Sequence, residues 1–185
     1  MVVNITQTPI QNLLVIETKI FLDERGFFME SYSKKDFADA GITDEFVQEN
    51  HSRSQKGVLR GMHFQDLEAP MTKLVRCTRG TIFDVAVDLR SNSRTYGQWF
   101  GVELSEENKK MFYVPVGFAH GFQNISDVAD IQYKQTNYYL PHAEKSIAWN
   151  DPNIKIDWPL PDPILSERDS KAMSFAEYRN APIFT

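Results

Sequence analysis

Short apolar runs separated by turn residues constrain the fold of this chain more than any other feature. They occupy residues 13–21, 27–32, 57–64, 73–75, 82–89, 98–104, 110–114 and 131–139. Runs of this length are typical of β-strands, and their regular recurrence is typical of a sandwich or barrel. Residues 82–89 also alternate between an apolar set and a mixed set that contains Asp84 and Asp88. We therefore predict an all-β fold in which Asp88 faces solvent and Asp84 faces either solvent or a wet interior.

Helical signals are few and lie outside the apolar runs. Ser33 is a good N-cap for residues 33–40, which end at a glycine, and Ser174 begins a capping pattern over residues 174–178. The prolines within residues 158–163 cannot continue a strand ladder. We expect two short peripheral helices and an extended crossover that leads to a C-terminal appendage.

Composition limits the classes of partner. The 185 residues contain no repeat or low-complexity linker, so we predict one domain over residues 1–185. The net charge of -5 opposes a broad nucleic-acid surface, and Cys77 alone cannot form a disulfide framework. No run reaches the roughly 20 apolar residues of a membrane helix, and the first residues lack a leader pattern. We expect a cytoplasmic protein that binds neither nucleic acid nor membranes.

The densest polar motif is Arg-Gly-Met-His-Phe-Gln at residues 60–65, with Lys73 on the next apolar run. Strand alternation predicts that Arg60 and His63 point to opposite faces. A histidine between two fixed cations suits acid–base chemistry on an anionic substrate, and a histidine hydrogen-bonded inside a sheet is the structural alternative.

A second motif, residues 115–122, places His120 at the start of a strand. Two histidines on neighbouring strands of a barrel can hold a metal, but jelly-roll metal sites usually contain a His-x-His pair that this chain lacks. A third ligand would have to be His51 or His142, both in turn-like segments. We expect a site without metal.

Metal-free acid–base chemistry in such a barrel suits proton abstraction beside a carbonyl. A base removes the proton, a cation stabilises the enolate, and an acid on the other face returns a proton with inversion. His63 fits the base, and a carboxylate would orient it. Asp84 and Asp169 are both candidates by residue type, and their spacing does not choose between them.

Several motifs occur in order from residue 23 to residue 169. They are residues 23–30, 47–52, 60–65, 115–122, 133–139, Glu144, 149–152, 158–159 and 165–169. Together they resemble the dTDP-4-dehydrorhamnose 3,5-epimerase family, and the resemblance covers nearly the whole chain.

The resemblance implies a metal-free cupin jelly roll without a cofactor, normally a homodimer, that inverts C3 and C5 of dTDP-4-dehydro-6-deoxy-D-glucose. It implies that His63 is the base, Asp169 its orienting acid, Tyr133 the proton donor, and Lys73 the charge beside the enolate. The implied substrate-binding residues are Arg25, Phe28, Glu30, Gln48, Asn50, Arg60, His120, Tyr139, Glu144 and Arg168. Of these, the three arginines would face the diphosphate, Glu30, Gln48 and Asn50 the nucleoside, Tyr139 the thymine ring, and His120 the sugar.

The chain departs from the family pattern at three positions. Met62 and Phe64 stand where the family usually has leucine and tyrosine, which removes one hydroxyl near the pocket. Arg168 stands where lysine is usual, which keeps the charge but changes its shape and reach. We expect catalysis to survive these changes, and nucleotide affinity to be the property that they affect.

Two other functions share these residues. An epimerase that acts at C3 alone would use the same catalytic groups, and a noncatalytic nucleotide-sugar-binding cupin would use only the binding residues. Individually, the tyrosines also suit a core, Lys73 suits a solvated strand end, and Arg25 with Glu30 suits a surface pair. The sequence leaves open whether Arg25, Phe28 and Glu30 serve their own subunit or a neighbour.

Overall fold

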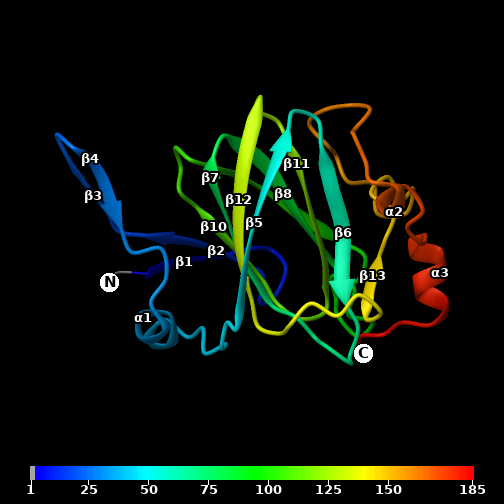
Figure 1. Ribbon diagram of the computed structural model, residues 1–185. Helices are drawn as coiled ribbons and strands as arrows, with labels where there is room; N and C mark the ends of the chain where they lie inside the picture. The colour runs from blue at the N-terminus through cyan, green and yellow to red at the C-terminus, as the bar shows by residue number, and fades with distance from the viewer. Residues whose placement is uncertain (1–2) are drawn as a thin grey trace.

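A computed structural model describes residues 3–185, and β-strands dominate it (Figure 1). The first sheet has six strands in the order β1-β2-β10-β7-β12-β5. Their bounds are β1 Val3–Gln7, β2 Leu14–Thr18, β5 Gln48–Gln55, β7 Lys73–Arg79, β10 Met111–Val114 and β12 Val128–Gln135. Residues 1 and 2, which the single-domain prediction includes, lie outside the described residues.

The second sheet has five strands in the order β13-β6-β11-β8-β9 and faces the first (Figure 1). Its strands are β6 Leu59–Gln65, β8 Thr81–Asp88, β9 Trp99–Ser105, β11 Phe118–Asn124 and β13 Glu144–Ser146. Strands β3 Ile20–Asp23 and β4 Gly26–Met29 form a separate hairpin that projects from the barrel (Figure 1). The all-β jelly-roll prediction is therefore confirmed.

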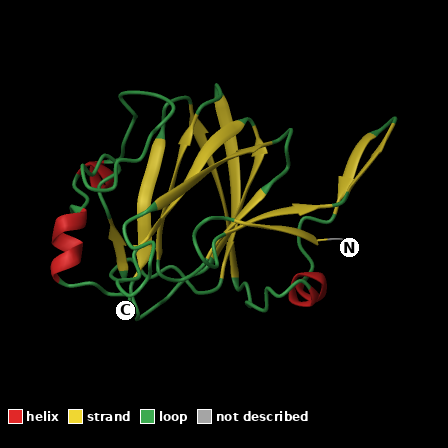
Figure 2. Cartoon of the chain, turned by 180° about the vertical axis from the view of Figure 1, so that it is seen from behind, coloured by secondary structure: helices red, strands yellow, loops and turns green. Residues whose placement is uncertain are grey.

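The described helices are short and peripheral, as predicted (Figure 2). Helix α1 Lys34–Asp39 begins after the N-cap Ser33, and α3 Phe175–Asn180 begins after Ser174, which forms a full capping box with Glu177. The four-residue helix α2 Glu167–Ser170 was not predicted. None of the helices in residues 3–185 has the length and apolar character needed to cross a bilayer.

The second sheet is buried on both faces. Ile82 and Ala86 of β8 pack into the core between the sheets, whereas Val85 and Val87 pack against the C-terminal appendage. The appendage contributes Phe175, Tyr178 and Phe184 to this second core, and Ile154, which precedes the crossover, joins them. The crossover at residues 158–163 therefore leads to a layer that covers the outer face of the sheet.

The segment that follows β8 corrects one expectation about this strand. Asp88 was predicted to face solvent, but its relative exposure is 0%. Its carboxylate accepts hydrogen bonds from Arg90, Ser93 and Thr95. Because burial is tolerated when a charge is paired and hydrogen-bonded, a strand pattern with acids on one face does not by itself indicate a solvated face. Asp84 also has 0% exposure, which agrees with the alternative that this side chain faces the interior of the barrel.

Two glycines allow strands β6 and β11 to approach closely. A Cβ atom on Gly121 would lie 2.7 Å from the carbonyl oxygen of Arg60, and one on Gly61 would lie 2.6 Å from the Cα of Gly121. The same pairing sets His120 directly opposite His63. The glycines therefore fix the spacing of the two histidines.

We predict that Gly121→Ala lowers the free energy of unfolding by about 1–3 kcal/mol, because the methyl group overlaps backbone that cannot rotate away. Chemical denaturation measures this change. The control is Gly57→Ala, where no atom lies within 4 Å of the added Cβ and only the positive φ of +79° is strained. A loss for Gly121→Ala no larger than that of the control would contradict the steric argument.

Candidate active site

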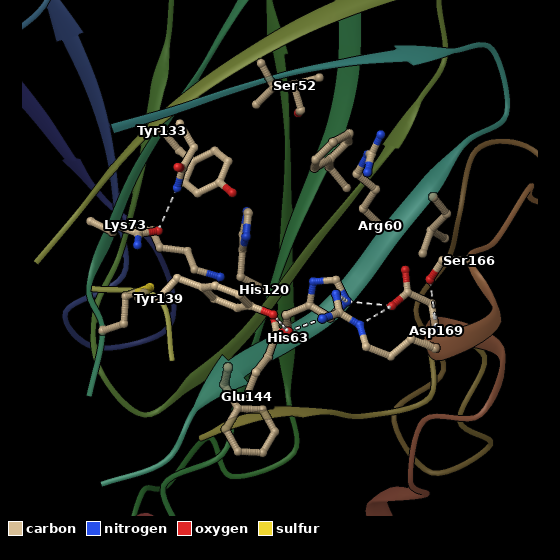
Figure 3. A pocket seen from close by; sticks show the side chains of 18 of the residues that line it. Ser52, Arg60, His63, Lys73, His120, Tyr133, Tyr139, Glu144, Ser166 and Asp169 are labelled. Carbon is tan, nitrogen blue, oxygen red and sulfur yellow. Dashed lines mark hydrogen bonds and ion pairs between the residues drawn. The ribbon is translucent and has the colours of Figure 1, made fainter. Parts of the chain in front are cut away.

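A cavity of about 670 Å³ lies between the two sheets (Figure 3). One wall comes from β5, β7 and β12 of the first sheet, and the other from β6, β11 and β13 of the second. Residues 164–166 and helix α2 border it from the appendage. The cavity therefore collects side chains from both sheets and from the C-terminal segment.

His63 and Asp169 form the pair nearest to the appendage. Nε2 of His63 lies 2.6 Å from Oδ1 of Asp169, and the backbone N–H of Asp169 is capped by the Ser166 hydroxyl at 3.1 Å. Burial would raise the pKa of Asp169, but the hydrogen bonds and charges around it outweigh burial and lower that pKa. An ionised Asp169 accepts the Nε2–H, so the lone pair of His63 is on Nδ1.

His120 pairs with the other candidate carboxylate. Nε2 of His120 lies 2.6 Å from Oδ1 of Asp84 inside the barrel. Burial lowers the pKa of His120, and the charge of Asp84 only partly opposes this. The structure therefore resolves the alternative that spacing left open: Asp169 contacts His63, and Asp84 contacts His120.

Lys73 lines the same cavity from the first residue of β7. Burial lowers the pKa of Lys73 to about 8, and the charges of Glu144 and Asp84 oppose this only in part. The reading of Lys73 as a solvated strand-end lysine is therefore wrong. Its ammonium is a cation held near the two histidines (Figure 3).

Tyr133 projects from β12, on the wall opposite to His63. Burial raises the pKa of Tyr133, and a hydrogen bond from Asn50 reduces this shift. The phenol therefore keeps its proton at neutral pH. Since Tyr133 and His63 stand on facing sheets, a ring bound between them would present one face to each.

Polar side chains form a network at the mouth of the cavity. Glu144 accepts a hydrogen bond from the Tyr139 hydroxyl at 2.9 Å and pairs with Arg168. Nη2 of Arg168 also lies 3.2 Å from Nε2 of His63. The network thus brings the Arg168 guanidinium next to the His63–Asp169 pair and links it through Glu144 to the Tyr139 ring.

A row of amides lines the first-sheet wall. Gln48 donates to Asn50 at 3.0 Å, and Asn50 donates to Gln135 at 3.0 Å. The backbone N–H of Tyr139 donates to Gln48 at 3.3 Å. The amides that were predicted to bind a nucleoside therefore lie between Tyr133 and Tyr139.

Arg60 enters the same cavity as His63, so the prediction that they point to opposite faces is wrong. The register between β6 and β11 shifts between His120 and Phe122, which interrupts simple alternation. Nε of Arg60 donates to the Ser54 hydroxyl at 3.1 Å. A further cation is thereby fixed in the cavity.

Arg25, Phe28 and Glu30 do not line this cavity. Arg25 and Phe28 belong to the projecting hairpin, and Glu30 follows it directly. Arg25 pairs with Asp23, and Phe28 is 65% exposed. All the other predicted catalytic and substrate-binding residues line one cavity. They are Gln48, Asn50, Arg60, His63, Lys73, His120, Tyr133, Tyr139, Glu144, Arg168 and Asp169.

The histidines considered for a metal are dispersed. His51 lies 3.8 Å from Asp130, and His142 lies 2.8 Å from Glu68, both outside the cavity lining. Within residues 3–185 no group of three or more histidine, cysteine, aspartate or glutamate side chains is arranged to hold a metal ion.

The sequence reasoning missed Ser52, Gln135 and Ser166, which also border the cavity. Ser52 continues the alternation of Gln48 and Asn50 along β5, and Gln135 continues that of Tyr133 along β12. A search for polar alternation, in addition to apolar alternation, would have found both.

Comparisons with known proteins all identify relatives in one family. A family model described as dTDP-4-dehydrorhamnose 3,5-epimerase matches residues 7–177. The dTDP-4-dehydrorhamnose 3,5-epimerase of Shigella flexneri is 50% identical over 175 residues, which cover 94% of this chain and 97% of that protein.

Two solved structures extend the comparison. The dTDP-6-deoxy-D-glucose-3,5-epimerase of Legionella pneumophila in complex with dTDP-4-keto-L-rhamnose is 53% identical, with a TM-score of 0.90 over 93% of this chain and 92% of that one. A 4-keto-6-deoxy sugar epimerase from the novobiocin gene cluster of Streptomyces spheroides is 38% identical, with a TM-score of 0.94 over 100% of this chain and 93% of that one.

We predict that the side chain of Lys73 titrates with a midpoint near pH 8, because burial disfavours its charged form. Heteronuclear NMR of the lysine side chains measures the midpoint, and Lys73→Met identifies the signal. Lys35 is the internal control, since its exposed ammonium pairs with Asp39 and its pKa is raised. Titration of Lys73 together with the surface lysines would show that the cavity does not desolvate it.

Proposed function

The chain belongs to the dTDP-4-dehydrorhamnose 3,5-epimerase family, and we propose from this that it inverts C3 and C5 of dTDP-4-dehydro-6-deoxy-D-glucose. The observation that carries the proposal is the placement of an oriented histidine and a protonated tyrosine on facing walls of one cavity. Both C3 and C5 adjoin the C4 carbonyl, so one set of groups serves both carbons.

In the proposed reaction, Nδ1 of His63 removes the proton from the carbon beside the carbonyl. The electron pair of the broken C–H bond forms a carbon–carbon double bond, and C4–O becomes an enolate oxygen. Asp169 stabilises the imidazolium that forms, as a hydrogen-bonded carboxylate does for other catalytic histidines. Lys73 supplies positive charge for the enolate.

Tyr133 then donates its phenolic proton to the same carbon from the opposite face, which inverts the configuration. The raised pKa of Tyr133 supports this role, because the donor must hold its proton at neutral pH. His63 gives up its proton to solvent and Tyr133 regains one, so the enzyme returns to its starting state.

The binding residues divide by chemistry. Guanidinium groups suit diphosphate oxygens, so Arg60 and Arg168 are proposed to hold the diphosphate. An aromatic face suits a base, so Tyr139 is proposed to stack on thymine. Gln48 and Asn50 supply amide hydrogen bonds to the nucleoside, and His120 borders the sugar. A cytoplasmic location remains a prediction from the sequence.

The proposed function is tested by proton NMR of dTDP-4-dehydro-6-deoxy-D-glucose in deuterated water with chelator-treated protein. We expect proton exchange at both C3 and C5. In His63→Ala, the exchange rates at both carbons should fall by about 10²–10⁴-fold. His142→Ala is the matched control, because this histidine is exposed and pairs with Glu68 outside the cavity.

Each other result has a defined meaning. Exchange at C3 alone would indicate a single-site epimerase, and tight dTDP binding without exchange would indicate a noncatalytic binding protein. Retained exchange in His63→Ala would overturn the assignment of His63 as the base.

We also propose that the protein is a homodimer in which the hairpin of each subunit completes the site of its partner. The hairpin supports this, since Leu22, Phe27 and Phe28 are 80%, 56% and 65% exposed although apolar. Arg25, Phe28 and Glu30 lie outside their own cavity, and a two-fold axis would supply both sites equally.

Subunit complementation tests this arrangement. Arg25→Ala and His63→Ala homodimers are each expected to have low activity, but after random subunit exchange about a quarter of the wild-type activity should return. In the mixed dimer one site then receives an intact Arg25 and an intact His63. If Arg25 serves its own subunit, both sites of the mixed dimer are defective and no activity returns.

A further inference from the structure

We propose that Ser52 is a sugar-binding residue whose hydroxyl bonds to the C2 hydroxyl of the substrate's hexose. This inference rests on the proposed function and assigns a specificity role to Ser52, which lies in the 47–52 motif but is not among the predicted binding residues.

The Ser52 hydroxyl is unusual for a buried polar group. Ser52 lines the cavity, yet its Oγ is shielded from solvent and has no hydrogen-bond partner among residues 3–185. Thr18 Oγ1 and Tyr96 OH share this condition but do not line the cavity. Because an unpaired buried hydroxyl destabilises the folded state, a ligand that supplies the partner explains why serine stands there.

The position of Ser52 along the wall identifies the partner. On paired strands β5 and β12, Asn50 lies opposite Tyr133, and Ser52 lies opposite Ile131. The next residue on the same face, Ser54, accepts a hydrogen bond from Arg60. Same-face residues on a strand are about 6.6 Å apart, so Ser52 lies between the proton donor and the cation (Figure 3).

The substrate has the same order of groups. A 4-keto-6-deoxyhexose joined to a diphosphate through C1 has free hydroxyls only at C2 and C3. C3 is a reaction centre beside Tyr133, and the diphosphate oxygens face Arg60. C2 lies between them, opposite Ser52.

The contact needs little rearrangement. A serine hydroxyl turns about a single bond and can donate or accept, so Oγ reaches a ligand oxygen without movement of β5. Ile131, directly opposite Ser52, has no polar side-chain atom to compete for it.

Binding measurements test the contact without any need for turnover. Titration calorimetry compares dTDP-D-glucose, dTDP-2-deoxy-D-glucose and dTDP on wild type and on Ser52→Ala. We expect Ser52→Ala to weaken the binding of dTDP-D-glucose by about 10-fold, which is the effect of losing one uncharged hydrogen bond. The affinities for the other two ligands should stay unchanged. The control Thr18→Val removes a buried unpaired hydroxyl outside the cavity and should change none of the three.

A loss of affinity for all three ligands alike, or for none, would overturn the inference. Kinetics adds a second readout: Ser52→Ala should lower kcat/KM for the keto sugar by about 10-fold, with a much smaller effect on its 2-deoxy analogue. If wild type fails to exchange protons at C3 or C5, the proposed function fails, while calorimetry still decides whether Ser52 contacts C2.

Discussion

The contact between the C-terminal appendage and the second sheet is the constraint on which the site depends. His63 gains its carboxylate partner only because α2 is held beside β6, with 2.6 Å between the two side chains. The appendage is anchored from several directions: Phe64 packs on Tyr178 and Phe184, and Asp151 accepts the backbone N–H of Phe175. These contacts hold the carboxylate that orients His63, although they do not touch this histidine directly.

The same layer explains why phenylalanine is accommodated at position 64. Phe64 has a relative exposure of 4%, and its ring makes edge contacts to Tyr178 and Phe184. A phenol at this position would need a hydrogen-bond partner within an aromatic cluster. The loss of one hydroxyl relative to the family pattern therefore favours packing behind the site and does not affect Tyr133, the proposed proton donor, on the other wall.

The sequence predicted the strands with apolar residues and left out those with polar ones. Residues 82–89 indicated β8 because half of its side chains enter an apolar core. Strand β5, by contrast, has Gln48, Asn50 and Ser52 on the cavity face, so no apolar period marks it. The family resemblance supplied the roles of Gln48 and Asn50, which hydrophobic periodicity does not detect, and it assigned no role to Ser52.

Spacing also could not identify the pairs that cross the fold. His63 is 106 residues from Asp169, and His120 is 36 from Asp84. Which carboxylate meets which histidine follows from strand order and from the appendage, neither of which residue type determines. The burial of Asp88 and the shared cavity of Arg60 and His63 were mispredicted for related reasons, because hydrogen bonds from the segment after β8 and a register shift override simple alternation.

The cations of the cavity differ in how freely they can meet an anion. Arg168 is paired with Glu144, so a diphosphate that binds Arg168 must compete with a carboxylate. Lys73 and Arg60 form no ion pair with a carboxylate in the part of the chain that the structure describes. In a protein of net charge -5, attraction of a diphosphate has to come from such local groups.

An arginine at position 168 can keep one guanidinium edge on Glu144 and turn another toward the ligand, which the single ammonium of a lysine cannot do with the same geometry. The departure from the family pattern thus bears on how the substrate would be held, while the proposed proton transfer depends on His63 and Tyr133.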